Sequence, residues 1–350
     1  MEKNFIIYGA YGYTGTLITE LAVSKGLKPL LVGRSDQKLS SLANLHDLPY
    51  KVSDVKNLNL LNDIIGDYSL IMNCAGPFSE TAHQVIEYCI EKKLHYTDIT
   101  GEIGVFEMAK TFHQDGIDKN IMIMPGTGFD VVPTDCLAKY LSEKLPDATD
   151  LELAFKGVGG PSRGTSITMI SGMDKGGAIR KNGKITSVPN AYEVKKFDFD
   201  KPNLTAVTIP WGDVSTAFYS TGIPNIKVFM AMSPKMIKNL KLTNYIKGIL
   251  GLSFVKNFLK SQVKEGGPSE DVRAQANSYI VGKVSNEKGA SIMAKLKTIE
   301  AYTLTAETAL NIAQKILEGN FKAGYQTPSS AYGYQLILEI RGSELSDVLK

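Results

Sequence analysis

Residues Phe5–Thr16 read FIIYGAYGYTGT, an apolar run that ends at Gly9 and is followed by Gly12 and Gly15. An amphipathic stretch, Leu17–Leu21, comes directly after, so the glycines lie between a predicted strand and a predicted helix. In that context the first glycine permits a tight turn and the second lets a diphosphate approach the backbone. The third lets the helix pack closely on the strand, and the helix N-terminus attracts phosphate. The alternative is a glycine-rich turn without a ligand. The predicted dinucleotide contacts of this loop are Gly9, Tyr11, Gly12, Tyr13, Thr14 and Gly15.

Strand and helix signals alternate through the rest of the first third of the chain. A helical pattern at 81–93 is flanked by apolar runs typical of buried strands, and strands separated by helices of this length favour a parallel sheet. The sequence therefore predicts a doubly wound α/β sheet whose ligand crevice lies at the carboxyl ends of the strands. The further predicted strands are Pro29–Gly33, Tyr50–Val55, Ser69–Gly76, His95–Gly101 and Ile121–Gly128.

The pattern changes after Pro133. Alternating stretches such as Leu151–Phe155 and Ile226–Met230 are spaced farther apart and are mixed with loops. That arrangement favours an α+β domain with a mostly antiparallel sheet.

The composition excludes several classes of protein. The chain has 350 residues, enough for two domains, and its net charge of +3 is too small to indicate a nucleic-acid partner. The three cysteines have no paired spacing and the four histidines have no ligand spacing, so we expect neither disulfides nor a metal site. The N-terminus enters a strand at once, and no apolar run reaches the roughly 20 residues of a spanning helix. We therefore expect a cytoplasmic protein.

The end of the second predicted strand bears on the choice of cofactor. A carboxylate there would bind the ribose 2′-hydroxyl of NAD, but the strand ends in Gly33-Arg34-Ser35. The Arg34 guanidinium matches a 2′-phosphate, with help from Ser35, whereas Asp36 comes slightly too late. The sequence thus favours NADP (NADPH) over NAD; the alternative is an arginine on a solvent-facing turn.

Other strand ends are expected to border the same crevice and to contact the cofactor. Asp54 closes the third strand and Gly101 follows the fifth. The fourth ends in Ala75, Gly76, Pro77 and Phe78. Because a dinucleotide supplies hydride chemistry, an oxidoreductase is the leading class.

Residues 235–264 form a separate feature, since they combine apolar side chains with seven lysines. One interpretation is a basic amphipathic segment that contacts a membrane or lipid or covers an oily substrate. The other, which we favour on general grounds, is a packed helical hairpin whose lysines face water.

Tyr140 and Lys144 have the Tyr-x-x-x-Lys spacing of short-chain dehydrogenases. The same spacing occurs three more times in a chain with 16 tyrosines, so it is a weak indication of such a site.

Several blocks resemble a known group, the saccharopine dehydrogenase-like NADP-binding proteins. These are YGAYGYTG, CAGPF (Cys74–Phe78), YTDITGE (Tyr96–Glu102) and GTGFDVVPTD (Gly126–Asp135). PSRGTSITM (Pro161–Met169), PWGDVSTAFYSTGIPN (Pro210–Asn225) and the terminal LTAETAL and YQTPSSAYG segments resemble its trans-acting enoyl reductase branch.

The resemblance implies a Rossmann domain and NADP(H)-dependent redox chemistry. It places residues 1–133 plus about 324–350 in that domain. Residues 134–323 would form a second domain, which binds substrate or forms the contact of a homodimer. A non-catalytic NADP(H)-binding sensor or a lipid-associated binding protein is the alternative.

The chain has only five arginines, few for clamping a multi-carboxylate substrate, so we expect a small apolar substrate reduced at a conjugated double bond. The developing oxyanion would need a donor or a cation. Arg163 is our preferred partner for it. The other candidates are Glu102, Asp130, Asp213 and Trp211, each of which also has a structural interpretation as a cap or core residue.

Overall fold

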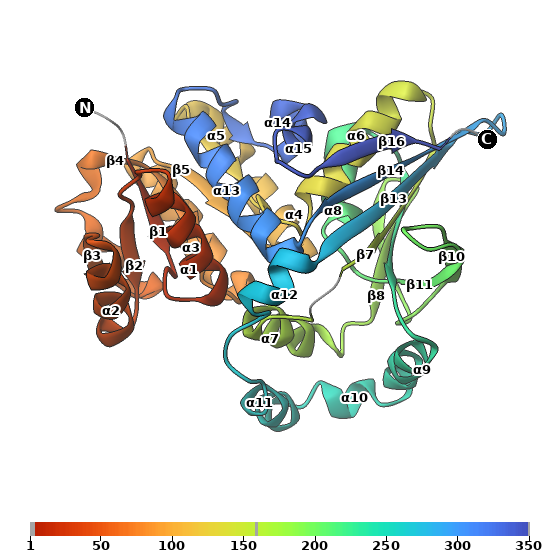
Figure 1. Cartoon of the computed structure of the whole chain (residues 1–350), viewed down its shortest axis with the longest axis horizontal. Helices are drawn as coiled ribbons and strands as arrows, with labels where there is room; N and C mark the ends of the chain where they lie inside the picture. Colours follow the sequence, from red (N-terminus) through yellow and green to blue (C-terminus); the bar gives the residue numbers. More distant parts are fainter. Residues whose placement is uncertain (1–3, 158–159, 349–350) are drawn as a thin grey trace. The chain divides into compact units, whose positions relative to one another are not determined.

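The computed structural model describes residues 4–157 and 160–348 (Figure 1). Contacts between residues divide the chain into two compact units. The first comprises Met1–Val132 and Tyr302–Ala331, and the second comprises Pro133–Ala301 and Tyr332–Lys350.

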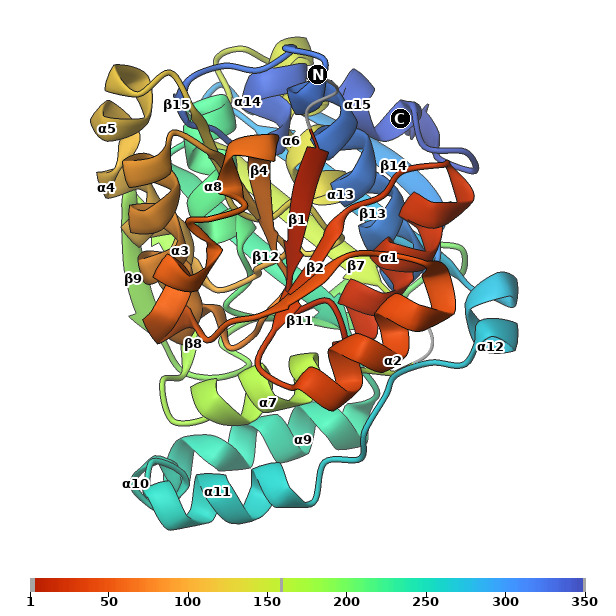
Figure 2. The same ribbon diagram turned by 90° about the vertical axis from the view of Figure 1, so that its left-hand side faces the viewer.

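The first unit is built on a seven-stranded sheet with the order β15-β6-β5-β4-β1-β2-β3, in which every pair is parallel. Figure 2 shows β4, β1 and β2 side by side. The strands are β1 (Asn4–Tyr8), β2 (Leu30–Gly33), β3 (Tyr50–Val52), β4 (Tyr68–Asn73), β5 (His95–Asp98), β6 (Met122–Met124) and β15 (Gly324–Tyr325).

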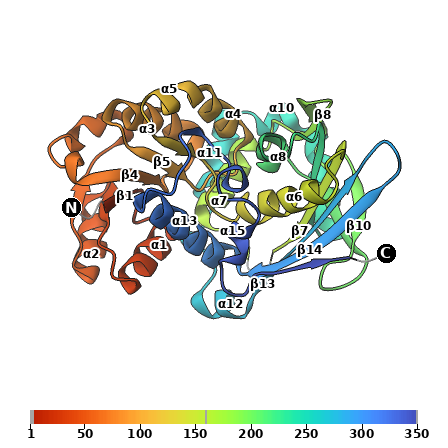
Figure 3. The ribbon, with the colours of Figure 1, turned by 90° about the horizontal axis from the view of Figure 1, so that it is seen from above.

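Helices cover both faces of this sheet. Figure 3 shows α1, α2 and α13 on one side of it and α3, α4 and α5 on the other. This is the doubly wound Rossmann-type arrangement that the alternating sequence pattern predicts. The helices are α1 (Tyr13–Ser24), α2 (Asp36–His46), α3 (Phe78–Lys92), α4 (Ile103–Thr111), α5 (His113–Asp118), α13 (Ala301–Leu317) and α14 (Pro328–Tyr332), with 3₁₀ turns at Val55–Leu61 and Ile65–Asp67.

The second unit contains a nine-stranded mixed sheet. Its main path runs β10-β11-β12-β7-β13-β14-β16, β8 pairs with β12 and β9, and all pairs are antiparallel except β12 with β7. The strands are β7 (Asp150–Lys156), β8 (Gly177–Lys181), β9 (Lys184–Val188), β10 (Val194–Phe197), β11 (Leu204–Thr208), β12 (Asn225–Ala231), β13 (Asn277–Ser285), β14 (Ser291–Ile299) and β16 (Glu344–Asp347). The helices are α6 (Val132–Lys144), α7 (Arg163–Gly172), α8 (Asp213–Thr221), α9 (Pro234–Leu242), α10 (Lys247–Leu250), α11 (Ser253–Ser261), α12 (Glu270–Gln275) and α15 (Gln335–Leu338), with a 3₁₀ turn at Thr243–Tyr245.

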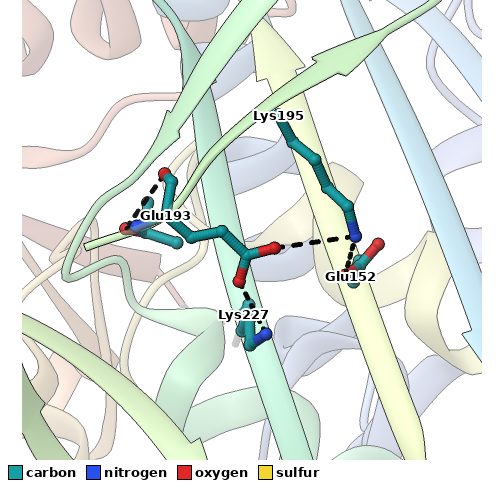
Figure 4. Close-up of polar contacts among 5 residues, drawn as sticks. Glu152, Glu193, Lys195 and Lys227 are labelled. Atoms are coloured by element: carbon teal, nitrogen blue, oxygen red, sulfur yellow. Dashed lines mark hydrogen bonds and ion pairs between the residues drawn. The ribbon is translucent and has the colours of Figure 1, made fainter. Parts of the chain in front are cut away.

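Buried apolar side chains and paired charges share one face of the second sheet, since Lys227 and Phe229 are two residues apart on β12. Phe197 and Phe229 belong to a buried cluster around Ala206 and Val281. On three neighbouring segments, Lys227 lies 2.7 Å from Glu193, and Lys195 bridges Glu193 and Glu152 (Figure 4). These two lysines and two glutamates thus neutralise one another beside the apolar cluster.

The C-terminal part of the chain is divided differently from the expected boundaries. Gly324–Tyr325 does return to the first sheet, where it pairs with Met122 and Ile123 on β6. However, β16 pairs with β14 in the second sheet, where Leu345 lies opposite the buried Leu296.

Helix α13 lies in the first unit although the sequence analysis placed it in the second. Its Thr305 hydroxyl accepts a hydrogen bond from the Phe129 backbone N–H at 2.9 Å, and its Thr308 hydroxyl donates to the Thr127 carbonyl at 2.7 Å. The two threonines therefore attach α13 to the loop that follows β6.

Candidate functional site

The loop between β1 and α1 uses its glycines for steric reasons. Gly9 has a φ of +83°, and a Cβ on it would lie 2.7 Å from the backbone nitrogen of Ala75. A Cβ on Gly15 would lie 2.6 Å from the carbonyl oxygen of Gly9, so this glycine allows α1 to pack on the turn. A Cβ on Gly12 would lie 3.3 Å from the same carbonyl oxygen. Its lack of a side chain keeps the helix entrance open.

The N-terminus of α1 begins at this loop and is available to an anion. Gly12 is the N-cap residue, and among the described residues no side chain caps the helix. The first turn of a helix has backbone N–H groups without intrahelical partners, together with the positive end of the helix dipole. A diphosphate fits this entrance, because a phosphate supplies the acceptors that an uncapped first turn lacks.

The carboxyl ends of the neighbouring strands lie in one row. The register pairs Tyr8 with Val32 on β2 and with Asn73 on β4, and it pairs Asn73 with Asp98 on β5. These strand ends border the crevice in which doubly wound sheets bind their ligands.

Asn73 organises the loop after β4. Its Oδ1 accepts a hydrogen bond from the Ala75 N–H at 3.0 Å, and its Nδ2 donates to Thr81 Oγ1 and to the Tyr96 hydroxyl. The Thr81 hydroxyl donates in turn to the Ala75 carbonyl at 2.7 Å. The loop Ala75–Phe78 is thereby held beside the Gly9 turn. The sequence analysis expected this loop to contact the cofactor but did not identify Asn73 as its support.

Asp98 forms a second buried support. The Tyr96 hydroxyl donates to its Oδ2 at 2.6 Å, and the backbone N–H groups of Thr100 and Gly126 donate to its Oδ1 at 3.0 and 2.8 Å. Burial raises the pKa of this carboxyl to about 6, and the hydrogen bonds act in the opposite direction. Asp98 connects the ends of β5 and β6, so it positions the loops that carry Gly101 and Asp130.

Asp130 lies against Gly101. A Cβ on Gly101 would meet the Asp130 Oδ2 at 2.7 Å, so the glycine creates the space for this carboxylate. Burial raises the pKa of Asp130 to about 7. A carboxyl group that titrates near neutral pH can both donate and accept a proton under ordinary conditions. Asp130 therefore stays a candidate acid or base at the carboxyl edge of the sheet.

Glu102 has a structural task. Its Oε1 accepts a hydrogen bond from the Phe78 N–H at 2.9 Å, and its Oε2 accepts from the Ser79 N–H at 3.2 Å. A carboxylate that caps the first turn of a helix in this way is stabilised by the helix dipole. Glu102 thus fixes α3 relative to the loop after β5, and the cap explains this residue without a role in the reaction.

Arg34 lies at the end of β2 with an accessible guanidinium. Its side chain is 75% exposed, and its Nε lies 3.9 Å from Asp54 Oδ2. Asp54 also caps the following 3₁₀ turn by accepting from the Lys56 N–H at 3.0 Å. Ser35 caps α2 by accepting from the Lys38 N–H at 3.4 Å. The predicted phosphate contact Arg34 is thus free to turn toward a ligand, whereas Ser35 and Asp54 each hold a turn beside it.

Tyr11 covers the end of β2. A Cβ on Gly33 would lie 2.6 Å from the Tyr11 ring, and the Lys38 ammonium lies 5.9 Å from the centre of that ring. Tyr11, Thr16 and Lys38 line an open pocket beside α2. Lys38 adds a cation to this pocket, and the sequence analysis missed it because a single lysine in a predicted helix has no distinctive pattern.

In the second unit, Asp213 and Trp211 are explained by packing. Asp213 has no exposed surface, and its Oδ2 accepts a hydrogen bond from the Thr134 hydroxyl at 2.8 Å. The Trp211 ring packs on Phe155 with 4.6 Å between ring centres. Asp213 therefore forms a structural link between α6 and α8, and its catalytic role stays a prediction.

Arg163 is accessible. It begins α7, its side chain is 46% exposed, and its Nη1 lies 4.0 Å from Glu265 Oε1. The contact is a long, exposed ion pair, which contributes little to stability. Arg163 therefore retains the charge and the exposure that an oxyanion partner needs, and its role stays a prediction.

Tyr140 and Lys144 are bound to one carboxylate. The Tyr140 hydroxyl donates to Asp347 Oδ1 at 2.8 Å, and the Lys144 ammonium forms a hydrogen bond and ion pair with Asp347 Oδ2. This arrangement attaches β16 to α6. The Tyr-x-x-x-Lys spacing is thus accounted for by packing.

Comparison with known proteins agrees with this geometry. Residues 5–124 match the family model described as the saccharopine dehydrogenase NADP binding domain. The saccharopine dehydrogenase-like oxidoreductase of Homo sapiens is 25% identical over 184 residues, which are 47% of this chain and 43% of that protein. The trans-acting enoyl reductase of Mycobacterium ulcerans (strain Agy99) is 24% identical over 161 residues, which are 44% of this chain and 38% of that protein. The chain matches less than two thirds of the length of the curated relatives, between 38% and 63%.

A solved structure shows the same fold over the whole chain. The apo saccharopine dehydrogenase (L-Glu forming) of Saccharomyces cerevisiae superimposes with a TM-score of 0.67, at 12% identity, and the match covers 99% of this chain and 100% of that one. At this identity the likeness concerns the fold, and it confirms the predicted combination of a Rossmann-type sheet with a second, mixed-sheet domain.

Proposed function

We propose that the chain is a saccharopine dehydrogenase-like oxidoreductase that uses NADPH to reduce a conjugated double bond in an apolar substrate. The family supports a nicotinamide cofactor. The observation that carries the proposal is the uncapped N-terminus of α1 behind the Gly9 turn, with the exposed Arg34 at the end of the adjacent strand.

The preference for NADPH over NADH rests on Arg34. In this structural class the residue at the tip of the second strand faces the ribose of the adenosine half. A guanidinium at that position can bind a 2′-phosphate with two parallel hydrogen bonds, and Lys38 adds charge nearby. The weak 3.9 Å contact with Asp54 would be exchanged for a phosphate contact at little cost.

Calorimetric titration of both cofactors tests this assignment. Arg34→Ala should weaken NADPH binding by about 1.5–3 kcal/mol and leave NADH binding nearly unchanged. Lys28→Ala is a matched control, because Lys28 precedes the other end of β2 and its ammonium lies 3.6 Å from the exposed Asp47 carboxylate. Equal losses for the two cofactors in Arg34→Ala, or an equal loss of NADPH binding in Lys28→Ala, would contradict the assignment.

The expected substrate is apolar because the chain has few groups that bind carboxylates bidentately. Of its five arginines, Arg34 is assigned to the cofactor. Arg180 is 4% exposed and donates to the Val214 and Gly183 carbonyls at 2.7 Å each. The resemblance to a relative named as an enoyl reductase supports reduction of a carbon–carbon double bond conjugated to a carbonyl group.

Asp130 is the proposed proton donor. NADPH, when bound, would supply a hydride for the β-carbon of the substrate. The α-carbon then takes a proton, so that one hydride and one proton are consumed for each double bond. With a pKa of about 7, the Asp130 carboxyl is about half protonated at neutral pH and can deliver this proton.

A screen of NADPH oxidation decides the reaction class. Enones and enoyl thioesters should be reduced, and simple ketones and imines should react more slowly. On the best substrate, Asp130→Asn should lower kcat by about 10²-fold or more with little change in NADPH affinity. Arg163→Gln tests the predicted oxyanion role in the same assay. If NADPH binds but no electrophile is reduced, a binding protein or sensor becomes the better assignment.

A further inference from the structure

Helices α9, α10 and α11 form a surface that the nucleotide site does not explain. We call residues 234–264 the basic helical segment. Its helices follow one another along one edge of the ribbon in Figures 1 and 2, with α7 beside α11. The sequence analysis expected either one amphipathic segment or a packed hairpin. The structure has short helices separated at Thr243–Tyr245 and near Gly251.

The inner side of this segment is anchored to the second unit. Ile237 packs in a buried cluster with Val207 and Ala191, and Leu250 is also buried. The Lys256 ammonium donates to the Asp174 carboxylate at 2.7 Å and to the Ser171 carbonyl at 3.1 Å. The helices are therefore held in place without the side chains on their outer side.

The outer side exposes large apolar residues. Tyr245 is 87% exposed, Phe254 is 71% exposed and Phe258 is 64% exposed. Phe254 and Phe258 are one turn apart on α11, so they project from the same side of that helix. Ile246, Ile249 and Leu252 between them are also exposed. A contiguous set of exposed aromatic and aliphatic side chains marks an interaction surface.

The charge of the segment has a single sign. It contains seven lysines and no Asp or Glu, and in the described residues only Lys256 has a carboxylate partner. The remaining lysines are Lys235, Lys238, Lys241, Lys247, Lys260 and Lys264. This surface therefore fits a partner that offers negative charge above an apolar layer.

We propose that the basic helical segment docks the protein on the surface of a bilayer that contains anionic phospholipid. Phe254, Phe258 and Tyr245 enter the boundary between headgroups and acyl chains, and the lysines contact the headgroup phosphates and carboxylates. Amphipathic helices rich in lysine and aromatic residues bind in this way, with the helix axis in the plane of the interface. None of the described helices is long and apolar enough to cross a membrane. The proposal concerns attachment and is independent of the cofactor.

Co-sedimentation of the full chain with vesicles tests the proposal. Vesicles of phosphatidylcholine with about 30% phosphatidylserine should bind the protein at least about tenfold more tightly than vesicles of phosphatidylcholine alone, and 0.5 M salt should reduce the binding. The double variant Phe254→Ser/Phe258→Ser should lose at least about tenfold in affinity. Lys238→Gln/Lys241→Gln/Lys260→Gln should lose about fivefold for each lysine at low salt.

Leu45→Ser is the matched control for the aromatic variant, since Leu45 lies on α2 and is 73% exposed. It should bind vesicles like the unmodified protein. Trp211 fluorescence, which reports on the second unit, should be unchanged in every variant and so shows that the fold is intact. Absence of binding to both kinds of vesicle, or equal binding by the double variant, would refute the proposal. If sedimentation velocity instead shows a dimer that the double variant dissociates, and vesicles do not bind, the surface joins two copies of the chain.

Discussion

The Gly9–Gly15 loop of the first unit and the α6–α8 region of the second unit use polar groups in opposite ways. In the loop, the polar groups belong to the backbone, they are left without side-chain caps, and the glycines keep the approach open. Around α8, Thr134 satisfies the buried Asp213, and the Ser220 hydroxyl donates to the buried Asp135. The first region has unused hydrogen-bonding capacity that a ligand can take, whereas the second uses much of its capacity for cohesion. Among the described residues, the buried Trp211 Nε1 and Thr216 Oγ1 of the second region have no hydrogen-bond partner.

This difference separates charged residues that can take part in chemistry from those that only hold the fold together. A carboxylate is a candidate for chemistry when it is accessible, as Asp130 partly is, and a structural group when its partners are internal, as for Asp213. The same distinction separates Arg34 from Arg180, because the second is enclosed by backbone carbonyls and the Phe218 ring. Three variants test whether the two regions differ as described.

The largest effect is expected for Gly9→Ala. The added Cβ would lie 2.7–2.9 Å from Ala75, and the φ of +83° is unfavourable for alanine. We expect a loss of about 3 kcal/mol or more in the stability of the first unit, together with loss of NADPH binding. Urea denaturation followed by far-UV circular dichroism measures the loss.

The control for this variant is Gly104→Ala in the first turn of α4. A Cβ there meets nothing within 4 Å, and its φ is not positive. This change should stabilise the same unit by about 0.5 kcal/mol, because alanine has less freedom in the unfolded chain. If both variants behave alike, the steric account of the Gly9 turn is wrong. Trp211 lies in the second unit, so the urea concentration at which its fluorescence changes should be the same in both variants.

An intermediate effect is expected for Asp213→Ala. The change removes the hydrogen bond between the Thr134 hydroxyl and Asp213 Oδ2 and opens space beside α8. The second unit should lose about 2–3 kcal/mol, seen as a shift of the Trp211 fluorescence transition to lower urea. NADPH binding should persist at urea concentrations below that transition. A variant with unchanged stability and abolished turnover would instead make Asp213 a member of the reaction centre.

The sequence predicted the first unit better than the second for a physical reason. The Gly9–Gly15 loop and the strands of a parallel sheet depend on local requirements, namely steric space at glycine and continuous burial of apolar runs. Those requirements appear as short motifs, so the doubly wound sheet could be inferred without coordinates. The placement of α13 and β16 depends on partners such as Thr127 and Leu296 that lie far away in the sequence. No local pattern records such a partner.

The residues of the candidate site also differ in whether the local sequence reveals them. Gly9, Gly12 and Gly15 were predictable because backbone geometry demands them. Asn73 and Asp98 were not, since each is the last residue of its strand and becomes informative only when the register places the two strand ends together. Glu102 was assigned to chemistry because a carboxylate after a strand looks the same in sequence whether it caps a helix or faces a ligand.

The smallest effect expected concerns pH and the Asp130 carboxyl. Burial raises its pKa from 3.8 to about 7, so folding favours the protonated form. The stabilisation is fully present below the unfolded pKa and is lost as the pH rises through about 7. The first unit should therefore be less stable at pH 8 than at pH 5, by on the order of 1 kcal/mol from this group, after allowance for its partial exposure. Asp98, whose pKa is raised to about 6, adds a change in the same direction.

Asp130→Asn should reduce this difference between pH 5 and pH 8 without abolishing it, because Asp98 still titrates. Denaturation of both proteins at the two pH values, followed by circular dichroism, measures the change. The Trp211 transition serves as an internal reference, since Asp130 lies in the other unit. The same substitution should flatten the pH profile of kcat around pH 7 if Asp130 supplies the proton. A pH-independent gap between the two proteins would mean that the carboxyl stays ionised throughout and is available neither as an acid nor as a source of pH-dependent stability.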